Sequence, residues 1–160
     1  MFTTFTFAAG AGGAELTVLG LLNTSALARM ASPTAAVTFV DESYRAVASA
    51  QATFRANLGP ERKAHFVVGN GLFDLANGRP ATVGFDLVLT NPPFHADHAI
   101  SDATAWQMFV ESRDALRSGG ELWVVGNRHL DYPAKLRRLF RTCDIIASDK
   151  KFMVLRSTKA

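Results

Sequence analysis

Short apolar runs alternate with amphipathic stretches along most of this chain. The apolar runs have the five or six residues typical of strands, and we predict strands over Ala36–Val40, Ala64–Val68, Phe85–Thr90 and Glu121–Val125. These runs lack strict alternation of apolar and polar residues, as do strands that are buried on both faces. The pattern therefore predicts an α/β fold, with a mostly parallel sheet and helices on both faces.

Three predicted helices follow predicted strands. One covers Glu42–Leu58 and ends at Gly59-Pro60, with a stripe of Tyr44, Val47, Ala48, Gln51, Phe54 and Leu58. A second has the face Ala105, Met108, Phe109, Ser112, Ala115 and Leu116 and ends at Gly119-Gly120. A third begins at Tyr132-Pro133 and runs through Phe140. After it, Asp144–Ala147 and Lys151–Leu155 flank a polar turn, which predicts an antiparallel hairpin.

The N-terminal segment is less regular. Phe2–Phe7 alternates Phe and Thr as a strand does, Ala8–Ala14 is a glycine-rich loop, and Glu15–Met30 is apolar enough for either a strand or a helix.

Composition narrows the class of protein. The 160 residues are 48% hydrophobic and 19% charged, which is typical of one folded domain over residues 1–160. No apolar run reaches the roughly 20 residues of a membrane span, and no basic flank precedes the apolar N-terminus. A single cysteine, Cys143, excludes an internal disulfide, and we expect it to be a small, half-buried side chain. We expect a cytoplasmic monomer.

Charge is distributed unevenly. Residues 1–112 carry six Lys and Arg against nine Asp and Glu, whereas residues 113–160 carry eleven against five. The C-terminal part therefore has a balance of +6 and favours a polyanion such as nucleic acid as a partner, although a solvated surface also accounts for it.

Polar residues stand where the predicted strands end. Asp41 follows a strand and precedes a helix, where a carboxylate can accept hydrogen bonds from both ribose hydroxyls of a nucleotide-like cofactor or can cap the helix. Asn70 lies between two glycines, where its amide can face an adenine edge or can simply form a turn. Ligands of such sheets bind beyond the carboxyl ends of the strands.

The most specific motif is Asn91-Pro92-Pro93-Phe94. Two prolines fix the backbone, and Asn91 before Pro92 is held extended. The Asn91 side-chain oxygen and the Pro92 carbonyl can then accept both N–H bonds of one amino group, which exposes the nitrogen lone pair to an electrophilic methyl group. Phe94 can stack on a base removed from its helix. The bland alternative is a loop made rigid by prolines around a buried Phe.

A metal site is the other chemistry that this region suggests. His95 and His98 flank Asp97, but no Cys or Glu stands at ligand spacing, so we expect no metal and place these residues at the substrate mouth.

These residues resemble a known family. The fold pattern is similar to the Rossmann-like class I S-adenosylmethionine-dependent methyltransferases, and Asn91-Pro92-Pro93-Phe94-His95 resembles the signature of bacterial rRNA guanine-N2 methyltransferases. The large-subunit enzymes among them resemble this chain over roughly residues 36–158. The matching stretches include Phe39-Val40-Asp41-Glu42-Ser43, Asn91 through Ala99, Gly120 through Tyr132 and Lys151 through Leu155.

The resemblance implies transfer of a methyl group from S-adenosylmethionine to N2 of one guanine in 23S rRNA. It implies that Asp41 contacts the cofactor ribose and that Asn70 lies near its adenine. It also implies that Asn91 and Pro92 hold the amine and that Phe94 stacks on the base. From charge alone, we expect Arg128 and the helix Lys135–Arg141 to meet phosphates.

Two departures separate the chain from that family. Family members carry an additional N-terminal half, and the Asp-Leu-Gly-Cys-Gly-Asn-Gly loop after their first strand is not found here. Either Phe2–Phe7 is the first strand, with Gly10–Gly13 a degraded loop, or Glu15–Val18 is the strand and the loop is lost after Val18. We favour the second placement. The alternative functions are a catalytically impaired RNA-binding remnant, or methylation of protein glutamine or adenine.

Overall fold

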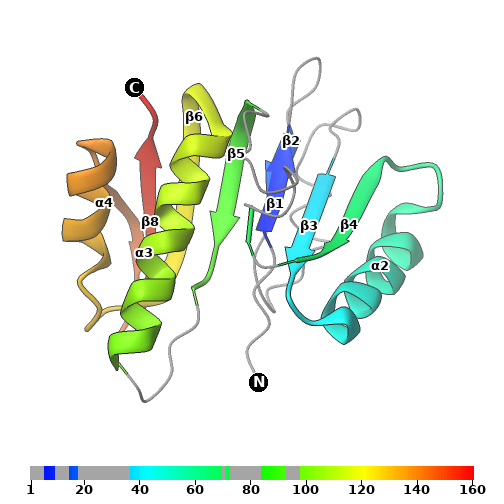
Figure 1. The fold of residues 1–160 in the computed structure, drawn as a ribbon, viewed down its shortest axis with the longest axis horizontal. Helices are drawn as coiled ribbons and strands as arrows, with labels where there is room; N and C mark the ends of the chain where they lie inside the picture. Colours follow the sequence, from blue (N-terminus) through cyan, green and yellow to red (C-terminus); the bar gives the residue numbers. More distant parts are fainter. Residues whose placement is uncertain (1–5, 10–14, 18–36, 70, 73–83, 93–97) are drawn as a thin grey trace.

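A computed structural model of the chain describes residues 6–9, 15–17, 37–69, 71–72, 84–92 and 98–160 (Figure 1). Their strands form an eight-stranded sheet in the order β4-β3-β1-β2-β5-β6-β8-β7. The strands are β1 (Thr6–Ala9), β2 (Glu15–Thr17), β3 (Val37–Asp41), β4 (Ala64–Val68), β5 (Phe85–Thr90), β6 (Leu116–Asn127), β7 (Asp144–Ser148) and β8 (Phe152–Thr158). The helices are α2 (Tyr44–Leu58), α3 (His98–Ala115) and α4 (Tyr132–Phe140). The Rossmann-like α/β prediction is confirmed.

The sheet is more mixed than the sequence predicted because of β1. Parallel pairing joins β3 to β4, β2 to β5 and β5 to β6, whereas β1 is antiparallel to β2, β3 and β5. The predicted C-terminal hairpin is confirmed, since β7 and β8 are antiparallel and β8 also pairs antiparallel with β6. Of the two N-terminal strands, β2 is the one parallel to β5, which agrees with the placement of the first strand at Glu15–Val18.

The helix α2 begins and ends as local chemistry dictates. Ser43 caps it by accepting a hydrogen bond from the Ala46 backbone N–H through its side chain, and Gly59 ends it with φ of +80°. Its predicted stripe was partly wrong: Ala46, Val47, Ala50 and Phe54 are the buried residues, and Tyr44 is 75% exposed. Tyr44 lies in the first turn, beyond the sheet that the helix covers.

A second correction concerns the boundary after α3. The helix ends at Ala115 and β6 begins at Leu116, so the strand starts before the glycine pair that was predicted to end the helix. Gly120 allows this because a Cβ there would stand 2.7 Å from the Phe85 backbone oxygen. The close approach of β5 and β6, absent from the sequence pattern, extends the strand through both glycines. The predicted bounds of α4, Tyr132–Phe140, are confirmed.

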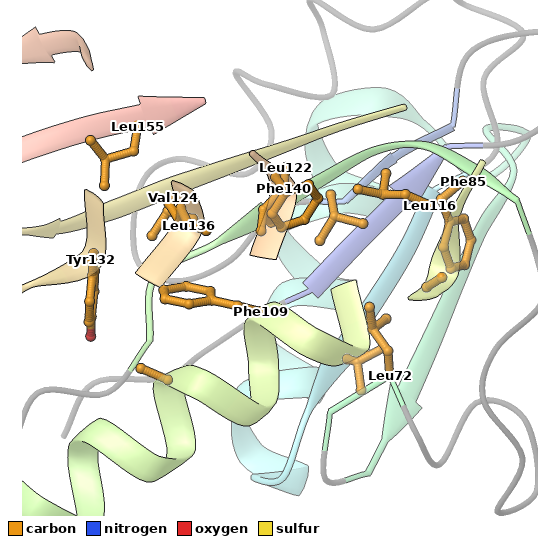
Figure 2. Packing of buried hydrophobic residues seen from close by; sticks show 14 of the residues in the cluster. Leu72, Phe85, Phe109, Leu116, Leu122, Val124, Tyr132, Leu136, Phe140 and Leu155 are labelled. Atoms are coloured by element: carbon orange, nitrogen blue, oxygen red, sulfur yellow. The ribbon is translucent and has the colours of Figure 1, made fainter. Parts of the chain in front are cut away.

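Two apolar clusters form the core. One lies under α2, where Phe39 of β3 stacks on Phe66 of β4 at 4.9 Å and meets Phe54 of α2 edge-on at 5.5 Å. The other lies between the sheet and α3 and α4, and includes Phe109, Tyr132 and Leu136 (Figure 2). Val37 and Phe39 belong to the first cluster and Val40 to the second, so β3 is covered on both faces.

Cys143 is half-buried against the second cluster, as predicted, and burial raises the pKa of its thiol. None of the described helices is long and apolar enough to cross a membrane.

Candidate functional site

The carboxyl ends of four strands lie along one side of the sheet, which we call the site edge. These strands are β3, β4, β5 and β6. β3 runs parallel to β4, and β5 runs parallel to β6. Because β1 is antiparallel to both β3 and β5, those two strands also run in the same direction. The carboxyl ends of β3, β4 and β5, which carry Asp41, Val68 and Thr90, therefore lie on a single edge, at the bottom of the sheet in Figure 1.

The strand register places Asp41 and Asn91 at the same level of that edge. Phe7 of β1 stands opposite Phe39 of β3 on one side and Leu89 of β5 on the other. Asp41 lies two residues after Phe39, and Asn91 lies two residues after Leu89. Although β2 also lies between β1 and β5 elsewhere in the sheet, β1 pairs directly with β5 at Phe7, so two strand spacings, about 10 Å, separate Asp41 and Asn91 at this level. A nucleoside-sized ligand can span this distance between the carboxylate and the amide.

Asp41 is buried and ordered by its surroundings. The residue is 4% exposed, and its Oδ1 accepts a hydrogen bond from the Ser43 backbone N–H at 2.7 Å. The cap of α2 is Ser43, so helix capping, the alternative reading of Asp41, is done by another residue. The Asp41 backbone oxygen also accepts a hydrogen bond from Gly69 N–H at 3.0 Å, which holds the end of β3 against the end of β4.

Two exposed apolar residues are near Asp41, one as its neighbour in the sheet and one along the chain. Val68 is its register partner on β4 and is 49% exposed, and Tyr44, three residues further along the chain, is 75% exposed. A carboxylate next to an uncovered apolar surface has the chemistry of a nucleoside half-site, with acceptors for ribose hydroxyls and a surface for the ring. These residues therefore fit the sugar and base of the cofactor implied by the resemblance.

Asn70 itself lies outside the described residues, but both of its neighbouring segments are held. Gly71 has φ of +75°, and the Leu72 backbone N–H donates to Glu111 Oε2 of α3 at 3.0 Å. Gln107 Nε2 donates to the other oxygen of that carboxylate at 2.7 Å. Glu111 thus ties the loop after β4 to α3. Sequence reasoning missed this residue, and only its spacing of four from Gln107 could have indicated it.

The amine-binding motif is described in part. Asn91 is half-buried and Pro92 is buried directly after β5, whereas Pro93, Phe94, His95 and Asp97 lie outside the described residues. Thr90 precedes Asn91 and is 2% exposed, and its Oγ1 is buried without a hydrogen-bond partner in the described chain. A buried unpaired hydroxyl is uncommon and marks a place where a polar group can arrive. From the sequence alone, Thr90 could be recognised only as a polar residue at the end of an apolar strand.

The predicted phosphate-binding helix is largely engaged elsewhere. Lys135 of α4 forms an ion pair with Asp102 of α3, and the guanidinium of Arg138 lies 5.4 Å from the ring centre of Trp106. At this helix, the exposed basic residues without such a partner among the described residues are Arg137 of α4 and Arg141, which caps the end of the helix. Asp86, in the strand before the motif, is also structural, since it pairs with Arg117 of β6.

The described residues contain no group of three or more His, Cys, Asp or Glu side chains that could hold a metal ion. His95 and Asp97, two of the three residues of the metal alternative, are outside that part of the chain.

Comparison with known proteins identifies the family. The family model of the methyltransferase small domain matches residues 17–156. The chain belongs to this methyltransferase family. The match begins at the last residue of β2 and includes both Asp41 and the motif at Asn91.

Named relatives are similar over most of this methyltransferase domain. Ribosomal RNA large subunit methyltransferase G of Streptomyces avermitilis is 57% identical over 130 residues, which are 81% of this chain and 32% of that protein. The protein of the same name from Streptomyces griseus subsp. griseus is 56% identical over 140 residues, 88% of this chain and 35% of its own. The chain therefore spans about a third of the length of these relatives.

Solved structures share the fold. A 16S rRNA N2 guanine methyltransferase of T. thermophilus, solved in complex with AdoMet and guanosine, has a TM-score of 0.68 and 30% identity. The match covers 84% of this methyltransferase domain and 33% of that chain. TrmN from Thermus thermophilus has a TM-score of 0.61 at 17% identity over 86% of this chain and 40% of its own, which shows the common fold alone.

Proposed function

We propose that this chain is the catalytic domain of an rRNA guanine-N2 methyltransferase that uses S-adenosylmethionine and acts on 23S rRNA. One observation carries the proposal. The strand register brings Asp41 and Asn91 to the same level at the carboxyl ends of β3 and β5. If Asp41 is taken as the ribose acceptor and Asn91 as the amine acceptor, the two lie about two strand spacings apart, roughly 10 Å. The identity to large subunit methyltransferases, 57% and 56% for the two described above, favours 23S rRNA as the substrate.

In this proposal the cofactor lies across the edge. Asp41 accepts hydrogen bonds from the ribose hydroxyls, the exposed apolar surface of Val68 and Tyr44 meets the ring, and Asn70 faces the adenine edge. When bound, S-adenosylmethionine supplies a methyl group on a positively charged sulfur. Glu111 acts as a positioning residue, because it holds Leu72 and therefore the loop that carries Asn70.

The chain's own part in the reaction is to orient the amine. The exocyclic nitrogen of guanine is conjugated with its ring and is a poor nucleophile. The Asn91 side-chain oxygen and the Pro92 carbonyl accept hydrogen bonds from its two N–H groups, which turns the lone pair towards the methyl group and requires no strong base. With the donor bound, the N–C bond would form as the methyl–sulfur bond breaks, S-adenosylhomocysteine would be the leaving group, and the methylated nitrogen would lose one proton to water. Phe94 stacks on the base and keeps it out of its helix.

The substitution Asn91→Ala tests the assignment of the amine site. We expect it to lower methyl transfer by 100-fold or more, on the order of the 2.7–4 kcal/mol lost with one preorganised polar group. Cofactor affinity should stay within about twofold, because Asn91 contacts the substrate. Transfer is measured with tritiated methyl donor on unmethylated 23S rRNA, and affinity by calorimetry. Asn57→Ala on the exposed face of α2 is the matched control.

Three results would contradict the proposal. Equal loss of cofactor affinity and transfer in Asn91→Ala would show that the residue is misassigned. Label transferred only to a release-factor peptide would make the chain a protein glutamine methyltransferase. No heat of binding at millimolar cofactor would leave an RNA-binding remnant of a methyltransferase.

A further inference from the structure

Three exposed basic side chains gather where β6, β7 and β8 reach the site edge. Arg128 follows β6, and Lys150 and Lys151 form the turn between β7 and β8. The two segments are far apart in sequence but are joined, since Asn127 at the end of β6 pairs with Phe152 at the start of β8. We call Arg128, Lys150 and Lys151 the hairpin cluster.

Backbone hydrogen bonds hold this cluster together. The Arg128 backbone N–H donates to the Lys151 oxygen at 3.0 Å, and Arg128 Nη1 donates to the Asp149 backbone oxygen at 3.1 Å. Asp149 Oδ1 accepts hydrogen bonds from the backbone N–H groups of Phe152 at 2.6 Å and Lys151 at 2.7 Å. These two bonds lower the pKa of Asp149 and fix the turn through its backbone. The lysine side chains are therefore presented by the turn rather than used to build it.

The hairpin cluster lies at the same ends of the strands as the candidate amine site. Thr90 of β5 stands opposite Val124 of β6, and β6 continues for three more residues, to Asn127. At about 3.3 Å per residue, the end of β6 lies about 10 Å beyond the level of Thr90. β6 and β8 are one and two strand spacings to the side of β5. The cluster is thus roughly 10–15 Å from Asn91, a distance that the strand spacing sets.

Neighbouring charges leave the cluster basic. Asp149 is the carboxylate within the turn and interacts with the charges of Arg128 and Lys151, so three basic side chains against one carboxylate leave a net charge of +2. Lys151 lies 5.1 Å from the ring centre of its neighbour Phe152, and no ion pair of Lys150, Lys151 or Arg128 with a described carboxylate is found. Arg113 of α3 and Lys135 of α4 differ from the cluster, because each of the two pairs with an aspartate.

We propose that the hairpin cluster binds the RNA phosphates that flank the methylated nucleotide. This inference rests on the proposed function for the identity of the RNA, but the binding is independent of methyl transfer. A base held at Asn91 leaves its neighbouring phosphates outside the site, within reach of long basic side chains on the raised end of β6 and β8. Basic contacts of this kind position an RNA strand without reading its sequence.

The double substitution Lys150→Gln with Lys151→Gln tests the inference. Binding of a fluorescently labelled 20-nucleotide single-stranded RNA is measured by anisotropy, without cofactor, across a salt series. The plot of log K against log salt has a negative slope, and the loss of two phosphate contacts should make that slope shallower by about 1.4. The ratio of the wild-type binding constant to that of the variant should therefore fall about sevenfold as the salt concentration rises from about 50 to about 200 mM.

Arg45→Gln with Lys63→Gln is the matched control, because it removes two exposed charges, one from α2 and one directly before β4, the strand at the opposite end of the sheet from β7. It should change the slope little, and a change as large as that of the lysine pair would overturn the inference in favour of diffuse charge. An unchanged slope in the lysine variant would also overturn it.

Methyl transfer provides a second measurement. Transfer to rRNA should fall in the lysine variant, whereas transfer to free guanosine, which has no phosphate, should be unchanged. Equal losses on both substrates would contradict the cluster's role. A wild-type chain that binds RNA with the expected slope but transfers no methyl group would count against the proposed function alone.

Discussion

Gly126 near the end of β6 is a sensitive position in the core, and we predict that Gly126→Ala destabilises the fold through Tyr132. A Cβ on residue 126 would stand 2.6 Å from Tyr132 Cδ2 and 2.8 Å from Cε2. Ordinary contact begins at 3.4 Å, so the ring would have to retreat by most of an ångström. Gly126 has no positive φ, and the cost comes from packing rather than from backbone strain.

The ring has little room to retreat. Tyr132 is 1% exposed and meets Phe109 of α3 edge-on at 5.1 Å, with fully buried Leu136 on the next turn of α4 (Figure 2). Overpacking of such a core costs about 1–3 kcal/mol. With a urea slope of about 2 kcal/mol per molar, a loss of about 2 kcal/mol lowers the unfolding midpoint by about 1 M.

Urea unfolding of four chains measures this interaction. Tyr132→Leu removes the ring that the methyl group would meet, so Gly126→Ala should cost less than about 0.5 kcal/mol in that background. A cost of about 2 kcal/mol in both backgrounds would refute the explanation, because the penalty would then not depend on the ring.

Two further predictions concern buried hydroxyls. Burial, assisted by Asp102, raises the pKa of Tyr132 to about 12 from 10.0, so the folded chain keeps a proton that the unfolded chain loses first. Stability should therefore fall as the pH rises from 10 to 12, by on the order of 2 kcal/mol. Tyr132→Phe should lack this decline in urea unfolding at each pH, and a variant with the same decline would disprove the assignment. Thr90→Val should raise the free energy of unfolding by about 1 kcal/mol, because it removes a buried hydroxyl without a partner. Thermal unfolding of the two chains decides, and a less stable valine variant would indicate a hydrogen bond at that hydroxyl.

Periodicity and turn residues were enough to predict most elements. The apolar runs that became β4 and β5 had the observed bounds, because each is short and is closed by glycine or proline. The pattern failed where distant strands decide the outcome. Leu116 continues the apolar face of α3 but joins β6, since pairing with Phe85 competes with the helix. Tyr44 fits a helical stripe yet lies beyond the sheet that would bury it.

The candidate site could be predicted only from residues that act singly. Asp41 and Asn91 were identifiable because each ends an apolar strand. Their common level depends on β1, whose antiparallel course between β3 and β5 has no local signal. Glu111 and the hairpin cluster depend on contacts across 39 residues and across two separate turns, which spacing along the chain cannot reveal.

The position of β1 also bears on how this domain can change in evolution. One residue, Phe7, is the register partner of both neighbouring strands, so the heights of Asp41 and Asn91 refer to the same point. The connection between these strands, residues 42–84, can therefore gain or lose residues in its surface loops while the two half-sites stay aligned. Length variation among relatives should accumulate in that connection. An insertion within residues 6–9 would instead shift the methyl donor relative to the amine, and a displacement of about 1 Å is enough to slow such a reaction.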